Sequence, residues 1–178
     1  MLESIRLSYR SLREARTLTT MSILIALGLL LGLVTLVPNE FLKIGLGFTV
    51  TSAMGFLFGP VPACLGAGAI DVLRFFLRPT GPYFFGFTFN ALLTGTIYGL
   101  LLYHRRPTFW RCLLTKGVVS LTVNVILSTL WLAVLYGQAI NVLLPVRLIK
   151  NAVALPVEAA IMFFILKTME RVRQVQRK

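Results

Sequence analysis

Charged and polar residues inside long apolar stretches are the residues of this sequence best suited to binding chemistry. Asp71, Arg74 and Arg78 recur at helical spacing, so on a helix they share one face. A second stretch carries, on one face, Arg147, Asn151, Ala154 and Glu158. Two further stretches add, at helical spacing, Asn90, Thr94 and Tyr98, and then Asn124, Ser128 and Trp131. Four helices are therefore expected to present a polar face.

The charges in and beside these stretches are mostly positive. The cations are Lys43, Arg74, Arg78, Arg147 and Lys150, and the acids are Glu40, Asp71 and Glu158. Because local pairing leaves this group with positive charge, we expect an anionic ligand to neutralise it through charge-assisted hydrogen bonds.

Two other interpretations of these charges are open. In the first, each acid pairs with a cation of its own helix, as structural glue: Asp71 with Arg74 or Arg78, and Glu158 with Lys150 or Arg147. In the second, some of the cations snorkel to the outer lipid headgroups, namely Lys43, Arg78 and Lys150.

The segment from Arg78 to Phe87 combines rigid and aromatic residues. Two prolines and two glycines, which restrict the backbone, lie among four aromatic rings. Rings held on a rigid loop can stack on a flat ligand, which makes Pro82, Tyr83 and Phe84 candidate binding residues. An aromatic belt at the membrane interface would explain the same composition.

The elements that carry these residues are expected to cross a membrane. The 178 residues are 57% hydrophobic and 13% charged, with a mean hydropathy of +0.83, which is too apolar for a soluble domain. Since one crossing needs about 20 helical residues, we predict an all-α bundle of six transmembrane helices in a single domain, residues 1–178. The predicted spans are about 18–37, 44–58, 62–77, 84–103, 112–136 and 144–169. The second and third runs could alternatively form one re-entrant element.

Basic residues predict the orientation of this bundle. They cluster before the first run, around the connection that contains Arg105, and at the C-terminus. With six crossings these three regions fall on one side, and the positive-inside rule makes both termini cytoplasmic. This explains 13 of the 18 Lys and Arg residues, among them Arg105, Arg106, Arg111 and Lys116.

Several function classes are disfavoured. In so apolar a chain, the net charge of +12 reflects topology rather than nucleic-acid binding. Cys64, Cys112 and His104 lack partners at metal-ligand spacing, so neither a metal nor a disulfide is expected. No GxxxxGK[ST], HExxH or GxSxG occurs, so we expect no enzyme and no cofactor, and energy must come from partner subunits.

Two motifs carry a resemblance to a known family. The stretch Arg78-Pro-Thr-Gly-Pro-Tyr-Phe-Phe-Gly-Phe-Thr-Phe-Asn90, followed by Gly95-Thr-Ile-Tyr-Gly99, resembles the substrate-specificity subunits (S-components) of energy-coupling factor (ECF) vitamin transporters, most closely the folate-binding member. The similarity extends over the whole chain. It includes the length, the number of spans, the short second span and the basic ends. The resemblance implies a binding subunit in the bacterial plasma membrane that captures folate from outside and delivers it inward by reorienting against an ATP-driven module.

The resemblance also implies where folate would bind. The pocket would lie near the outer face, closed by the loops 38–47 and 78–84. The pterin would lie between Tyr83, Phe84 and Phe48, and Asp71 would accept hydrogen bonds from it, assisted by Asn90 or Asn151. The carboxylates would be held by cations from the set Lys43, Arg74, Arg78, Arg147 and Lys150.

Partner subunits are implied as well. Family members dock on a transmembrane coupling subunit, which works with two ATPase subunits, through an Ala-x-x-x-Ala motif on the first helix. Here the matching residues are Ser22 and Ala26, with Gly28 and Gly32 just beyond. The serine keeps the small size, but it leaves the register of the motif open, and the glycines could equally serve packing within the bundle.

Other functions compatible with the sequence are an S-component for another vitamin, a membrane enzyme, and a lipid-binding protein whose outer cations hold phospholipid headgroups.

Overall fold

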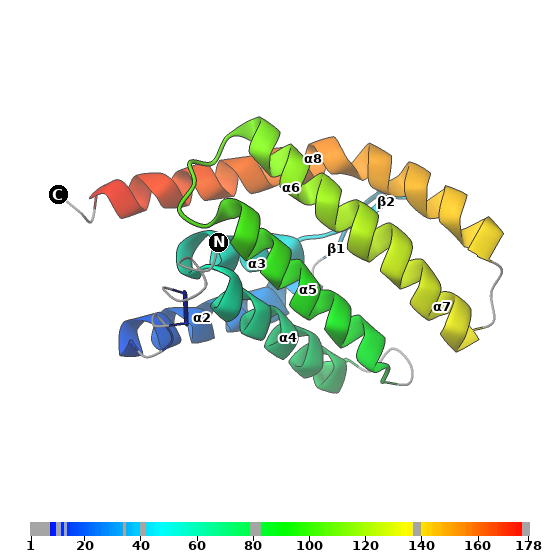
Figure 1. Ribbon diagram of the computed structural model, residues 1–178, viewed down its shortest axis with the longest axis horizontal. Helices are drawn as coiled ribbons and strands as arrows, with labels where there is room; N and C mark the ends of the chain where they lie inside the picture. Colours follow the sequence, from blue (N-terminus) through cyan, green and yellow to red (C-terminus); the bar gives the residue numbers. More distant parts are fainter. Residues whose placement is uncertain are drawn as a thin grey trace.

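The protein is a bundle of helices (Figure 1). A computed structural model describes residues 8–9, 12, 14–33, 35–39, 42–78, 83–136 and 140–175. The helices are α2 (Ala15–Leu33), α3 (Gly47–Phe58), α4 (Pro60–Leu77), α5 (Phe85–Leu102), α6 (Phe109–Val119), η1 (Ser120–Leu127), α7 (Ser128–Tyr136) and α8 (Ile140–Val175). The segments α6, η1 and α7 follow one another without a break and form one continuous rod.

Most of these helices are long and apolar enough to cross a membrane. The five segments of this kind are Ala15–Gly32, Pro60–Leu77, Phe85–Leu102, Phe109–Leu135 and Arg147–Val172. Helix α3 is a shorter apolar helix of 12 residues. The predicted all-α bundle of six helices is thereby confirmed.

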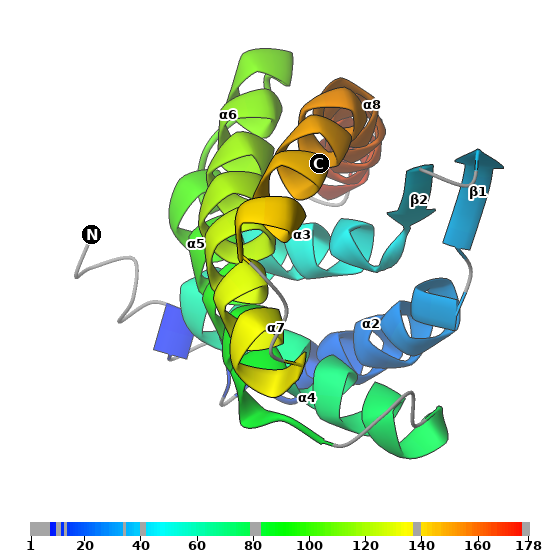
Figure 2. The same cartoon turned by 90° about the vertical axis from the view of Figure 1, so that its right-hand side faces the viewer.

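The segment between α2 and α3 differs from its predicted structure. Helix α2 ends at Leu33, and an antiparallel hairpin of β1 (Thr35–Asn39) and β2 (Leu42–Gly45) follows. The sequence pattern places part of this segment in the first span, because a short apolar run does not distinguish a strand from a helix. Figure 2 shows the hairpin at one side of the bundle, where β2 contacts both α2 and α8.

Small residues allow α4 and α5 to pack closely. A Cβ atom on Gly99 would collide with Pro60, and one on Gly95 would collide with the carbonyl of Ala63. Helices α3 and α4 are separated by Gly59 alone, whose φ of 88° is readily adopted only by glycine. These contacts fix the relative positions of the helices that carry the acidic and amide residues of the candidate site.

The helix ends form two groups at opposite ends of the bundle. The start of α2, the connection between α5 and α6, and the end of α8 lie at one end, on the left in Figure 1. The end of α4, the start of α5 and the end of α7 lie at the other end. The first end carries basic residues from all three regions, including Arg16, Arg105, Arg106, Lys167 and Arg171. This grouping is the one that the sequence predicts.

Candidate ligand-binding site

Asp71 of α4 is held by a chain of hydroxyl groups from α5 and the residues before it. Thr88 donates its hydroxyl proton to Oδ2 of Asp71 at 2.8 Å, and the hydroxyl of Tyr83 lies 2.7 Å from that of Thr88. Because Thr88 has a single hydroxyl proton, Tyr83 must donate to Thr88. The ring of Tyr83 also packs edge-on against Phe75, with 5.0 Å between centroids. One bond leaves the Asp71 carboxylate with acceptor capacity for a ligand.

Asn90 of α5 is anchored by α7. The indole nitrogen of Trp131 donates to Oδ1 of Asn90 at 3.1 Å, and Nδ2 of Asn90 donates to the hydroxyl of Ser128 at 3.1 Å. An indole N–H can only donate, so this contact sets which way the amide faces. One N–H of Asn90 is left for a ligand. Asn90 therefore positions Trp131 as much as it offers a contact of its own.

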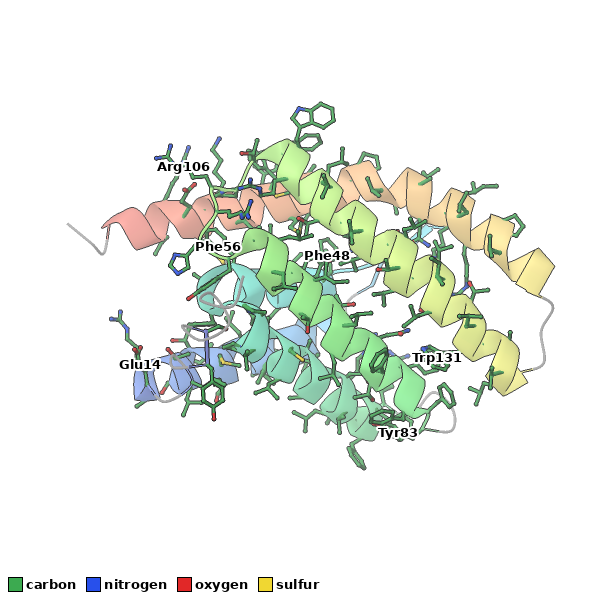
Figure 3. The ribbon with its side chains drawn as sticks, in the orientation of Figure 1. Glu14, Phe48, Phe56, Tyr83, Arg106 and Trp131 are labelled. Carbon is green, nitrogen blue, oxygen red and sulfur yellow. The ribbon has the colours of Figure 1, made fainter. Side chains whose placement is uncertain are left out.

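Aromatic rings gather at the same end of the bundle. Phe84 lies edge-on to Trp131, with centroids 5.5 Å apart, and to Phe87, with centroids 5.9 Å apart. Gly86 makes this approach possible, since a Cβ atom there would lie 2.7 Å from the indole of Trp131. In Figure 3, Tyr83 and Trp131 lie near the start of α5, while Phe48 lies further into the bundle.

Arg147 and Asn151 connect α8 to η1, which is a segment of π-helix. Nη1 of Arg147 donates to the backbone carbonyl of Asn124 at 3.1 Å. Oδ1 of Asn151 accepts from the hydroxyl of Ser120 at 2.9 Å, and its Nδ2 donates to the carbonyl of Arg147 at 2.8 Å. The Asn151 amide is thus engaged within the protein, whereas the Arg147 guanidinium has further N–H groups to offer. Segments of π-helix often occur at functional sites.

A buried ion pair lies beside Phe48. Nζ of Lys116, on α6, is 3.2 Å from Oε2 of Glu158 on α8, and the two side chains are 4% and 14% exposed. The same ammonium group lies 3.8 Å from the centroid of the Phe48 ring. This pairing differs from the expected partners of Glu158, which were Lys150 and Arg147. It also shows that Lys116 is a core residue, although the sequence pattern assigned it to the cytoplasmic rim.

The remaining cations are more exposed. The Arg74 side chain lies over Gly32 of α2, where a Cβ atom would be 3.6 Å from its Nη1. Arg78, at the end of α4, and Lys150, on α8, are exposed. Among the described residues, Asp71 forms no ion pair within 4.0 Å, so the expected pairing with Arg74 or Arg78 is not observed. Pro82 and the side chain of Lys43 lie outside the part of the chain that the structure describes.

The predicted residues therefore form three small networks rather than one. Each network joins two helical segments: α4 with α5, α5 with α7, and η1 with α8. Sequence reasoning missed Lys116, Thr88 and Ser120. Thr88 and Ser120 carried no signal beyond their polarity, whereas Lys116 stands well inside a span, and its position relative to Cys112 and Val119 could have identified it as buried.

The small residues proposed for docking divide between two faces of α2. Ser22 and Ala26 are exposed. Gly28 is buried, and a Cβ atom there would lie 2.6 Å from the side chain of Ile70 on α4. Gly32 is buried beneath Arg74. The two glycines thus face the interior of the bundle, and Ser22 and Ala26 face outward.

The chain resembles known proteins in both sequence and structure. Residues 16–166 match the family described as ECF transporter, substrate-specific component. The chain is 31% identical over 160 residues to the folate transporter FolT of Clostridium novyi (strain NT), covering 90% of this chain and 93% of the relative. It is 29% identical over 159 residues to the folate transporter FolT of Leuconostoc mesenteroides subsp. mesenteroides, covering 86% and 85%. A crystal structure of FolT bound with folic acid matches with a TM-score of 0.78 and 32% identity, covering 87% of this chain and 95% of the other.

Proposed function

The chain belongs to the substrate-specific components of ECF transporters, and from this membership we propose that it is the folate-binding subunit of such an importer. The observation that carries the proposal is the match to FolT bound with folic acid, which extends over 87% of the chain at 32% identity. As a member of this family it is a substrate-binding transport subunit, not an enzyme.

The arrangement of polar and aromatic groups supports this ligand. Folate combines a flat pterin, which carries N–H donors, with a glutamate tail that carries two carboxylates. Asp71 supplies acceptors for the pterin edge, and Tyr83, Phe84 and Phe48 supply aromatic faces. Arg147 supplies donors for a carboxylate. Asn90 holds Trp131 in place, and Asn151 links α8 to Ser120 of η1 beside Arg147.

The other cations extend the positive region around the tail. Arg74 and Arg78 on α4, Lys150 on α8 and Lys43 on β2 are the further candidates for the carboxylates. An Arg side chain can bind a carboxylate through two parallel hydrogen bonds, which a Lys side chain cannot do. We therefore place the arginines first among the residues that hold the tail.

Transport requires partners, which the proposal takes from the family. A transmembrane coupling subunit and two ATPase subunits would supply the energy, and Ser22 and Ala26 on the exposed face of α2 would meet the coupling subunit. The membrane would be the bacterial plasma membrane, with the basic end of the bundle in the cytoplasm.

Calorimetry with folate titrated into the detergent-purified protein tests the proposal. We expect one saturable site with a dissociation constant below about micromolar. A fluorescence titration gives an independent reading, because the chain has two tryptophans and Trp110→Phe leaves Trp131 as the reporter within the site. Absence of saturable folate binding would overturn the proposal, and parallel titrations with riboflavin, thiamine and pantothenate would then show whether another vitamin takes its place.

A further inference from the structure

A hollow lies at the junction of α5 and α6, apart from the residues proposed to bind folate. It has a volume of about 450 Å³, which is within the range of roughly 300–1,000 Å³ typical of small-molecule sites. Its walls are formed by Leu101, Arg105, Thr108, Trp110, Arg111, Leu114 and Thr115. Figure 3 shows the neighbouring Arg106 at the end of the bundle opposite Tyr83 and Trp131.

The charged residues that line this hollow are all positive. Arg105 and Arg111 line it, and Arg106 adjoins it. The sequence contains no Asp or Glu between Asp71 and Glu158. Within the described ranges, none of these three arginines forms an ion pair within 4.0 Å, and Nη1 of Arg111 makes only a long bond of 3.5 Å to the carbonyl of Arg106. The guanidinium groups are therefore available to an anion.

One wall of the hollow is apolar and faces away from the protein. Trp110 is 73% exposed and Leu114 is 61% exposed, both on α6. Since α6 begins a membrane span, these side chains contact lipid in a bilayer, and Trp110 lies at the end of the span, where Trp residues favour the interface with the headgroups. The hollow thus combines arginines with a surface suited to acyl chains.

From this combination we propose that the junction of α5 and α6 binds the headgroup of an anionic phospholipid. Arg105 and Arg111 hold the phosphate, and an acyl chain of the same lipid lies along Trp110 and Leu114. A free phosphate would satisfy the arginines but would leave the apolar wall uncovered. A zwitterionic lipid would cover the wall, but its own ammonium group would offset the attraction of the arginines. The proposal requires only that the span is in a membrane, and it does not depend on the identity of the vitamin.

Quenching of Trp110 by brominated lipid provides the test. Trp131→Phe leaves Trp110 as the single tryptophan, and the full chain is reconstituted in phosphatidylethanolamine vesicles that contain increasing fractions of brominated phosphatidylglycerol or brominated phosphatidylethanolamine. We expect phosphatidylglycerol to quench at much lower mole fraction. Arg105→Gln with Arg111→Gln should reduce that preference about tenfold, because two charge-assisted bonds are lost. Arg171→Gln, at an exposed arginine of α8, is the matched control and should retain the preference.

A measurement on the wild-type protein guards against a variant that fails to fold. In detergent, phosphatidylglycerol should raise the midpoint of thermal unfolding, and inorganic phosphate at the same concentration should not. Equal quenching by the two brominated lipids, an equal loss in the Arg171→Gln control, or stabilisation by inorganic phosphate alone would each overturn the proposal.

Discussion

The ammonium group of Lys116 lies 3.2 Å from the carboxylate of Glu158, and this ion pair is largely buried between α6 and α8. The same ammonium group contacts the ring of Phe48 at the start of α3, so one cation connects three helices. Burial removes the hydration of both charges, which makes each group dependent on the other. The pair therefore sets the position of Phe48, one of the rings proposed to meet folate.

Lys116→Met should destabilise the protein, because it leaves the carboxylate of Glu158 buried without its partner. Removal of one member of a buried ion pair costs about 3–5 kcal/mol. We expect a clear drop in the unfolding midpoint in detergent, which Glu158→Gln added to the same chain should partly reverse. The matched control is Lys150→Met, at an exposed lysine of α8, where we expect a change within about 0.5 kcal/mol. Equal midpoints for the two single variants would show that the pair contributes little.

Asp71→Asn should weaken folate binding and leave the fold intact. The asparagine oxygen can still accept the hydrogen bond from Thr88, but the side chain loses its charge and one acceptor oxygen. A hydrogen bond to a charged group contributes roughly 1.5–3 kcal/mol, so calorimetry should show a loss of affinity of about 10- to 100-fold. Glu14→Gln, at an exposed acid near the start of α2, is the control. Unchanged affinity for Asp71→Asn would remove Asp71 from the site.

Arg147→Gln should reduce folate affinity more than Lys150→Gln does. Arg147 is half-buried and is oriented by its bond to Asn124, whereas Lys150 is exposed and its position is less constrained. We expect a loss of about tenfold or more for the arginine variant and less than about threefold for the lysine variant. Calorimetry measures both, and the unfolding midpoint shows whether loss of the bond to Asn124 has disturbed η1. The reverse order would assign the carboxylate to Lys150.

Hydropathy and helical spacing predict much of this fold, because both depend on the sequence alone. The number of helices, the grouping of their basic ends and the polar face with Asp71 follow in this way. The hairpin after Leu33 does not, since apolar residues are common to buried strands and helices. Nor does the partner of Glu158: the choice of Lys116 over Lys150 depends on how α6 and α8 are rotated against each other, and spacing within one helix carries no information about that rotation.

The candidate site, like the fold, can be predicted from the sequence only in part. Asp71, Asn90 and Arg147 are conspicuous because polar residues are costly within a span. Their hydrogen-bond partners Thr88 and Ser128 become evident only when helices are placed side by side. The segment of π-helix is likewise a property of the folded chain, where Arg147 of α8 bonds to a carbonyl within it.

Ala26→Leu should impair vitamin uptake by the assembled transporter and spare folate binding by the isolated subunit. Ala26 is exposed on α2, so a larger side chain there does not disturb the bundle, but it would prevent close approach of a partner helix. Uptake into vesicles with the coupling and ATPase subunits should therefore fall, with unchanged calorimetry in detergent. Ala152→Leu, at an exposed alanine of α8, is the matched control and should leave both unchanged.

Gly28→Leu should behave differently, although it lies on the same helix. Gly28 is buried, and its Cβ atom would lie 2.6 Å from Ile70, so a leucine there forces α2 away from α4. Overpacking of this kind lowers the free energy of unfolding by about 1–3 kcal/mol. It should therefore lower both the unfolding midpoint and the affinity for folate. If Gly28→Leu instead left binding and stability intact while abolishing uptake, the docking face would include the glycines, and α2 would have to rotate to present them.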